Sequence, residues 1–204
     1  MNLLKRQNAI FLCLLISIPA TSNATRFFIL DIPWQETLIL PNNSQKNLLV
    51  SIPTAAPGFN KRSLVYFDQQ YEVKYHKKAQ WVDTPARMLL PLLVHHLELT
   101  GLFNTVLSAS TSPIAASLRL DTEIVRLQQE FFTEPSQIHL VVRAQLLDMD
   151  ARSVLATRVF EITENARSED AEGGMLATNR AIARLLKAIT KFVKEHHEQN
   201  NAKK

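Results

Sequence analysis

The stretches LRLDTEI (residues 118–124) and IHLVVRAQL (residues 138–146) decide the fold that this sequence predicts. In both, apolar residues recur at every second position, so they fall on a single face of an extended strand. Residues 148–151 include two aspartates and can turn the chain into a third strand over residues 153–163. Three strands joined in this way predict an antiparallel meander. The predicted inward-facing side chains are those of Leu118, Leu120, Thr122, Ile124, Ile138, Leu140, Val142, Ala144 and Leu146.

A long amphipathic helix is predicted after the polar, acidic break at residues 168–174. Apolar side chains then recur at alternating spacings of three and four residues, which places them on one face of a helix of about five turns or more. Residues 199–204 are polar and are predicted to form a frayed tail. The stripe comprises Met175, Thr178, Ile182, Leu185, Ile189, Phe192 and His196, widened by Leu186 and Val193.

A second helix is predicted from Pro85, with Asp83 and Thr84 as caps and Gly101 as the stop. Residues 88–99 are apolar at most positions, so this helix should be buried nearly all round or covered by a partner. Pro91 should bend the helix or delay its regular start, because proline cannot donate the backbone hydrogen bond.

The N-terminal half contains shorter β-type runs at residues 25–32 and 48–52. Residues 63–75 alternate between apolar and polar and predict a hairpin with Asp68 and Gln69 in its turn. The order strands, helix, strands, helix predicts an α+β fold, with a mainly antiparallel sheet and two principal helices packed on one face. We expect one domain over residues 25–198.

Residues 1–24 have the order of a secretory signal peptide. Lys5 and Arg6 precede an apolar run of roughly ten residues, and small residues lead to a predicted cleavage after Ala24. The run is shorter than the about 20 apolar residues that a spanning helix needs, so a permanent anchor is the weaker alternative. Removal would leave 204 − 24 = 180 residues with 21 basic and 19 acidic side chains, because the leader holds two of the 23 basic ones.

Cys13 is the only cysteine and lies inside that apolar run. The exported chain would therefore lack disulfides, a catalytic thiol and thiolate metal ligands, which a domain of this size tolerates. The alternative is that Cys13 is a lipid attachment site. The residues Ile10, Phe11 and Leu12 before it fit lipoprotein processing poorly.

Few patterns in the sequence indicate chemistry. Its four glycines form no phosphate-binding loop and no nucleophile elbow, and its charges are interspersed, which disfavours nucleic-acid binding. His95 and His96 are adjacent and so diverge by about 100° on a helix, which disfavours a shared metal. We expect one of them to border the core and the other to be solvated. No catalytic residue, cofactor or metal is predicted.

Three further groups of polar residues are interpreted as surface features. They are His196 and His197 near a helix end, the carboxylates Glu161, Glu164, Glu169, Asp170 and Glu172, and the Asn42-Asn43-Ser44 triplet.

Aromatic and basic residues gather between residues 66 and 81. One interpretation is that the aromatics belong to the core and the lysines protect a sheet edge. The other is a partner-binding surface, because aromatic side chains beside cations are frequent interface anchors. The predicted partner-binding residues are Phe67, Tyr71, Tyr75, Lys77, Lys78 and Trp81, with Tyr66 and His76 beside them.

Several short stretches, in order, resemble the ABC-type transport auxiliary component family. They include LLVSIP (residues 48–53), YEVKY (71–75), Trp81 followed by Thr84-Pro85, TGLF (100–103) and AQLLD (144–148). The family comprises envelope proteins linked to MCE-domain lipid transporters, and the resemblance covers nearly all of the chain after the leader. Its members commonly carry a lipidated cysteine just before the first strand. This sequence has Asn23 and Ala24 there instead, which favours a soluble periplasmic protein.

The resemblance implies a non-enzymatic periplasmic accessory subunit of an MCE-linked lipid transport system. It implies docking on the MCE-domain or permease component, with a homo-oligomer as a further option. Membrane association would come through that partner or a lipid anchor, with the inner leaflet of the outer membrane as one site for it. One alternative is a structural or assembly protein of the envelope that scaffolds oligomers, and a third and weakest is an envelope hydrolase.

Overall fold

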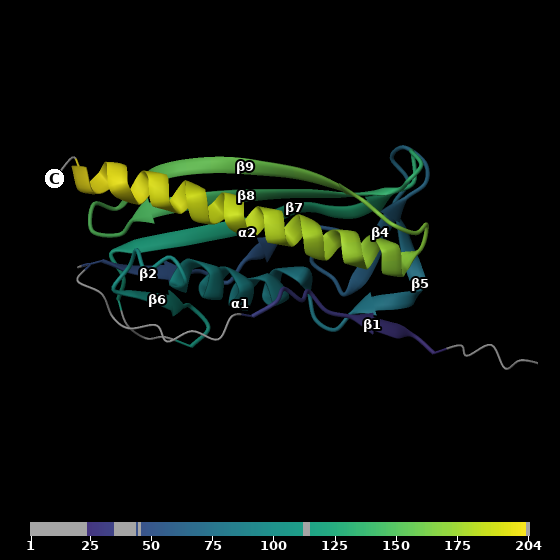
Figure 1. The fold of residues 1–204 in the computed structure, drawn as a ribbon, viewed down its shortest axis with the longest axis horizontal. Coiled ribbons are helices and arrows are strands. Elements are labelled where there is room, and N and C mark those ends of the chain that lie inside the picture. Colours follow the sequence, from purple (N-terminus) through teal and green to yellow (C-terminus); the bar gives the residue numbers. More distant parts are fainter. Residues whose placement is uncertain (1–23, 35–43, 45, 112–114, 203–204) are drawn as a thin grey trace, which may run out of the picture.

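Three long strands form the centre of the molecule in the computed structural model, which describes residues 24–34, 44, 46–111 and 115–202 (Figure 1). β7, β8 and β9 are consecutive antiparallel strands, and β8 pairs along its whole length with both neighbours. This is the meander that the alternating sequence predicts. The elements are β1 (Arg26–Phe28), β2 (Asn47–Val50), β3 (Thr54–Ala55), β4 (Ser63–Phe67), β5 (Lys74–Trp81), α1 (Pro85–Glu98), β6 (Thr105–Ser108), β7 (Leu118–Glu130), β8 (Gln137–Asp148), β9 (Ser153–Asn165) and α2 (Ala171–Ala202).

The other side of β7 is occupied by three short strands, one after another. β2 pairs with its start, β3 with its middle and β4 with its end, and all three run parallel to it. β6 extends the sheet beyond β2, whereas β5 and then β1 extend it beyond β4. The result is a nine-stranded mixed sheet whose longest ladders are antiparallel, which confirms the predicted α+β class.

Both helices lie on the same face of this sheet, as predicted (Figure 1). α2 contacts β8, β9 and α1, whereas α1 contacts β6 and β2. The inward-facing side chains of β7 and β8 meet the helices, and Leu118, Leu120, Ile124, Leu140 and Leu146 are completely buried. Removing such apolar surface from water is the main favourable contribution to the stability of this layer pair.

α1 begins at Pro85, as predicted, and includes Pro91 without a delayed start. Thr84 is its N-cap residue but forms no side-chain cap; instead, the Asp83 carboxylate accepts a hydrogen bond from the Thr84 backbone N–H. The helix ends at Glu98, and Gly101, three residues later, has φ +60°, a conformation open to glycine. Met88, Leu89, Leu92, Leu93 and Leu97 are among its buried residues, which confirms the prediction of a helix buried on most sides.

α2 differs from the prediction at both ends. It starts at Ala171, within the segment predicted as a break, because Asp170 caps it: its carboxylate accepts a hydrogen bond of 2.8 Å from the Gly173 N–H. At the other end it continues through Ala202, where the sequence predicts a frayed tail. The predicted stripe is buried up to Val193, but His197 and not His196 continues it into the core.

The N-terminal strands are shorter or shifted relative to the prediction. Residues 25–32 contain only the three-residue β1, and the second strand of the hairpin starts at Lys74. Residues 68–73 form the connection, so the turn is longer than Asp68 and Gln69 alone. Three predictions lie wholly or partly outside the described residues. They are the removal of the leader by cleavage after Ala24, the role of Cys13, and the Asn42-Asn43-Ser44 triplet.

Candidate partner-binding surface and apolar groove

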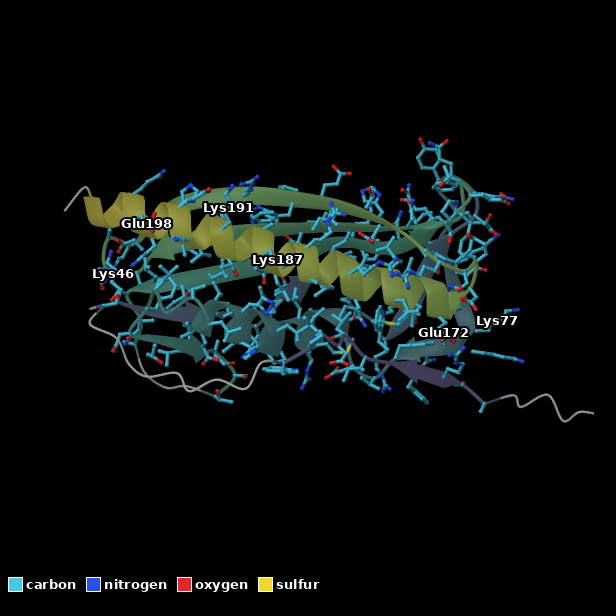
Figure 2. The ribbon with its side chains drawn as sticks, in the orientation of Figure 1. Lys46, Lys77, Glu172, Lys187, Lys191 and Glu198 are labelled. Atoms are coloured by element: carbon cyan, nitrogen blue, oxygen red, sulfur yellow. The ribbon has the colours of Figure 1, made fainter. Side chains whose placement is uncertain are left out.

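The β4–β5 hairpin carries most of the predicted partner-binding residues. Tyr71 is 90% exposed at its tip, and Tyr75, Lys77 and Lys78 are also exposed. Lys77 lies at the end of the molecule where α2 begins near Glu172, opposite the end that holds Lys46 and Glu198 (Figure 2). The structure therefore brings four of the six predicted residues to the surface of one hairpin.

Backbone geometry explains this exposure. Tyr71 has φ 70°, a left-handed conformation typical of a turn residue and not of a strand. In the ladder, Val65 pairs with Tyr75 while Ser63 pairs with Gln80, so β5 contains additional residues between these two pairs. Such a bulge interrupts the alternation of faces and leaves both Lys77 and Lys78 exposed.

Trp81 and Phe67 lie differently. Trp81 is only 4% exposed and belongs to the main core, so its predicted place on a contact surface is incompatible with its burial. Its backbone N–H donates to the Arg62 carbonyl at 2.7 Å, which holds the end of β5 against the start of β4. Phe67 is half-buried, and its carbonyl accepts a hydrogen bond from the Phe131 N–H.

Charges on the hairpin are partly paired within it. The Lys74 ammonium lies 2.9 Å from the Asp68 carboxylate and 3.6 Å from that of Glu72. The hydrogen bond to Asp68 is the main reason that the pKa of Lys74 is raised. Because these groups are exposed to water, the pairs orient the turn and contribute little to stability.

A second feature, which the sequence analysis does not identify, is an apolar groove of about 730 Å³ beside α1. Its central lining comes from Met88, Leu90, Pro91 and Val94 on the helix, which face Trp34 and Ile52 from the segments after β1 and β2. Trp34 is 57% and Ile52 50% exposed, an unusual position for two large apolar side chains that share one surface. The nearly all-round apolar pattern of residues 88–99 is the sequence signal that could have indicated it.

Polar groups surround the apolar centre of the groove. At one end the Arg87 guanidinium pairs with the Asp83 carboxylate at 3.0 Å. At the other end lies Glu98, whose carboxyl pKa is raised mainly by burial. Ser108, Ser110 and Thr111 add hydroxyl groups along the opposite wall, and the Ser108 and Ser110 hydroxyls are 2.8 Å apart.

The histidines are more buried than the sequence analysis predicts. His95 and His96 are both half-buried; the His95 ring packs on Trp34 with centroids 4.3 Å apart, and burial lowers the pKa of His96. The expectation that one of the pair is solvated is therefore wrong. His197 packs against Phe103, and burial again is the main reason for its lowered pKa. Among the described residues, no group of three or more histidine, cysteine, aspartate and glutamate side chains is arranged to hold a metal ion.

The acidic residues predicted as solvated surface make specific contacts. Glu164 accepts hydrogen bonds from Arg180 at 2.8 Å and Arg184 at 3.0 Å, which ties β9 to α2 and lowers the pKa of Glu164. The Glu161 carboxylate lies 2.7 Å from His139, whose other ring nitrogen lies 2.9 Å from Glu130. Sequence spacing could not reveal these pairs because their members belong to different strands and helices.

Comparison with known proteins agrees with this fold. A protein of Xanthomonas campestris of known crystal structure superposes with a TM-score of 0.75 at 17% sequence identity, covering 87% of this chain and 99% of the other. A second crystal structure, of an uncharacterized protein, gives a TM-score of 0.65 at 13% identity, covering 83% and 99%. At these identities the likeness concerns the fold alone. A search of curated proteins finds no match.

The arrangement of two helices on one face of a mixed sheet thus defines an α+β domain class known from solved structures. The family model of the ABC-type transport auxiliary lipoprotein component matches residues 33–190, and the chain belongs to this family. A lipoprotein family of this kind implies an envelope location. In the described residues, no helix combines the length and apolarity that crossing a membrane requires.

Proposed function

We propose that the chain is a periplasmic, non-enzymatic accessory subunit of an ABC-type lipid transporter, and that it docks on the transporter's MCE-domain component. The observation that supports this most directly is the family match over residues 33–190, because that family is an auxiliary component of ABC-type transport. The proposal goes beyond that match in three respects: the lipid cargo, the MCE-domain partner and the periplasmic location. These three rest on the sequence resemblance.

The β4–β5 hairpin is the docking surface in this proposal. Tyr71 and Tyr75 offer rigid aromatic side chains, and Lys77 and Lys78 add two cations to the same hairpin. Aromatic anchors with neighbouring cations often contribute most of the energy of an interface, whereas its rim contributes little. Because β4 and β5 lie at one end of the long axis and α1 lies nearer its middle (Figure 1), a partner on the hairpin would leave the groove beside α1 accessible.

The test is co-purification of the tagged mature chain with the MCE-domain protein of its own organism from detergent extracts. We expect the wild type to retain that protein, and the Tyr71→Ser/Tyr75→Ser double variant to recover at least ten times less, since an aromatic anchor is worth about 1.4 kcal/mol or more. Val159→Ser is the control, because Val159 is also an exposed apolar residue, on β9 and outside the hairpin.

Two outcomes would contradict the proposal in different ways. If the wild type recovers no MCE-domain protein, the proposed partner is wrong. If the double variant recovers as much as Val159→Ser, the partner stands and the hairpin is not the docking surface. Circular dichroism of all three proteins establishes that they are equally folded.

A further inference from the structure

We infer that the groove beside α1 holds one acyl chain of a phospholipid, with the headgroup left outside in water. This inference rests on the proposed function, because it gives a lipid-transport subunit a lipid-binding site of its own. The groove volume of about 730 Å³ lies within the range of about 300–1,000 Å³ that is usual for small-molecule sites.

The length of the groove fits a single acyl chain. Its lining on α1 runs from Arg87 to Glu98, which at about 1.5 Å rise per residue is roughly 16 Å. One leaflet of a bilayer contributes half of a hydrocarbon core of about 30 Å, so an acyl chain covers about 15 Å. The apolar centre, which includes Pro91 and Val94, lies between the charged ends of this span.

The walls favour a hydrocarbon chain over a peptide. One wall is a helix, whose backbone groups are largely satisfied within it, and the other is lined by the side chains of Trp34 and Ile52 together with the hydroxyl groups of Ser108, Ser110 and Thr111, of which the Ser108 and Ser110 hydroxyls bond to each other. An extended peptide in the groove would leave its own N–H and C=O groups unpaired against these side chains, at a cost of roughly 1–3 kcal/mol each. An acyl chain has no such groups, so it gains from apolar burial without that penalty.

A partner helix is also a poor fit. A helix with its side chains is about 10–12 Å across, so about 16 Å of it, the length of the groove, would occupy about 1,300 Å³ or more, which exceeds the groove volume of about 730 Å³. Such a helix could only lie across the opening, and would leave the region around Val94 unfilled.

The polar ends of the groove favour a phospholipid over a free fatty acid. Arg87 contributes the only guanidinium or ammonium group among the described lining residues, and it is already paired with Asp83. Glu98 at the other end would repel a second carboxylate whenever it is ionised. A phospholipid avoids both problems, because its charged headgroup remains outside the groove.

The two tryptophans provide a built-in test. Trp34 lines the groove and is 57% exposed, whereas Trp81 lies in the core. The probe is a phosphatidylcholine with brominated acyl chains, added to the mature chain as mixed micelles, because bromine quenches only tryptophans that it contacts. We expect saturable quenching in the wild type and its loss in Trp34→Phe, where only Trp81 remains. Brominated fatty acid serves as the second arm and should bind at least tenfold more weakly.

Ile52→Glu places a charge in the groove at a half-exposed position, so it should weaken phospholipid binding at least tenfold without unfolding the chain. Val159→Glu, at a similarly exposed site on β9, should bind like the wild type.

Two results would overturn the inference: equal quenching in Ile52→Glu and Val159→Glu, or no quenching in the wild type. A third variant replaces the apolar residues 38–40, which follow Trp34 in sequence, with polar ones. If quenching appears only in this variant, the chain fills its own groove, and the inference is overturned as well. Co-purification with the MCE-domain protein is measured separately, so a failure of this inference is distinguishable from a failure of the proposed function.

Discussion

The side chain of Gln129 on β7 lies where the Cβ atom of any residue other than glycine at position 174 would have to be. Gln129 cannot move away freely, because its side-chain amide donates to the Ser136 hydroxyl at 3.0 Å and to the Asp170 carbonyl at 3.3 Å. Gly174 thus lets the first turn of α2 approach the end of β7 closely. The glycine pair that resembles a break in the sequence is a packing feature in the structure.

Gly174→Ala is therefore expected to destabilise the chain by about 1–3 kcal/mol through overpacking. The sign is informative, because the same change in an unobstructed helix stabilises by about 0.5–1 kcal/mol. Urea unfolding followed by circular dichroism measures the difference. In a Gln129→Ala background the obstruction is absent, so Gly174→Ala should then be neutral or stabilising. A penalty equal in both backgrounds would contradict the proposed contact.

Ile189→Ala is expected to lower the free energy of unfolding by about 2–5 kcal/mol, because Ile189 is completely buried in the stripe of α2 that packs within the chain. Since that stripe is covered by the chain's own elements, the loss should not depend on protein concentration. Leu176→Ala is the matched control, because Leu176 lies half-exposed on the same helix and should cost little. Thermal melts over a wide dilution series test this prediction, and a wild-type melting point that falls markedly on dilution would indicate coverage by another subunit.

Stability is expected to fall as the pH drops below about 6.5, the ordinary pKa of histidine. Burial lowers the pKa of His76, His96 and His197 in the folded chain, so the unfolded chain binds protons that the folded one does not. Their contribution is complete above the unfolded pKa and is lost as the pH falls toward the folded values. Glu98 acts in the opposite direction, but only nearer pH 4.5, because its pKa is raised from that value.

Denaturant unfolding at pH 7.5 and pH 5.5 tests this sign. The wild type should be less stable at pH 5.5, and His197→Gln should show a smaller difference between the two pH values. A wild type that is equally stable at both would count against the burial of these rings as the cause.

Mass spectrometry of the exported protein is expected to find Thr25 as its first residue, without an acyl chain. The small residues before position 25 fit the signal peptidase, and Cys13 would be removed with the leader. A diacylglyceryl group on Cys13 would refute both the cleavage site and the unanchored state, and would match the lipoprotein processing that the family's description implies.

Local patterns in the sequence were sufficient to predict the meander of β7 to β9, both helices and the class of fold. Residues such as Leu120, Leu140 and Ile182 recur with the period of their own strand or helix, and that period determines which face is buried. The same reasoning predicted α1 from Pro85 to its stop before Gly101, because caps and stops act within a few residues of the chain.

Only the tertiary structure decided which strands lie beside β7, because parallel pairings such as Leu48 with Leu118 join segments far apart in sequence. It also decided that Tyr71 projects into water, because Tyr71 stands in the turn before β5 with φ 70°, and that Trp81 belongs to the core, because the bulge in β5 interrupts the alternation on which a sequence prediction depends. The groove has the same origin. Trp34, Ile52 and Val94 have no periodic relationship in the sequence, and they share one surface because β1, β2 and α1 pack around a common core.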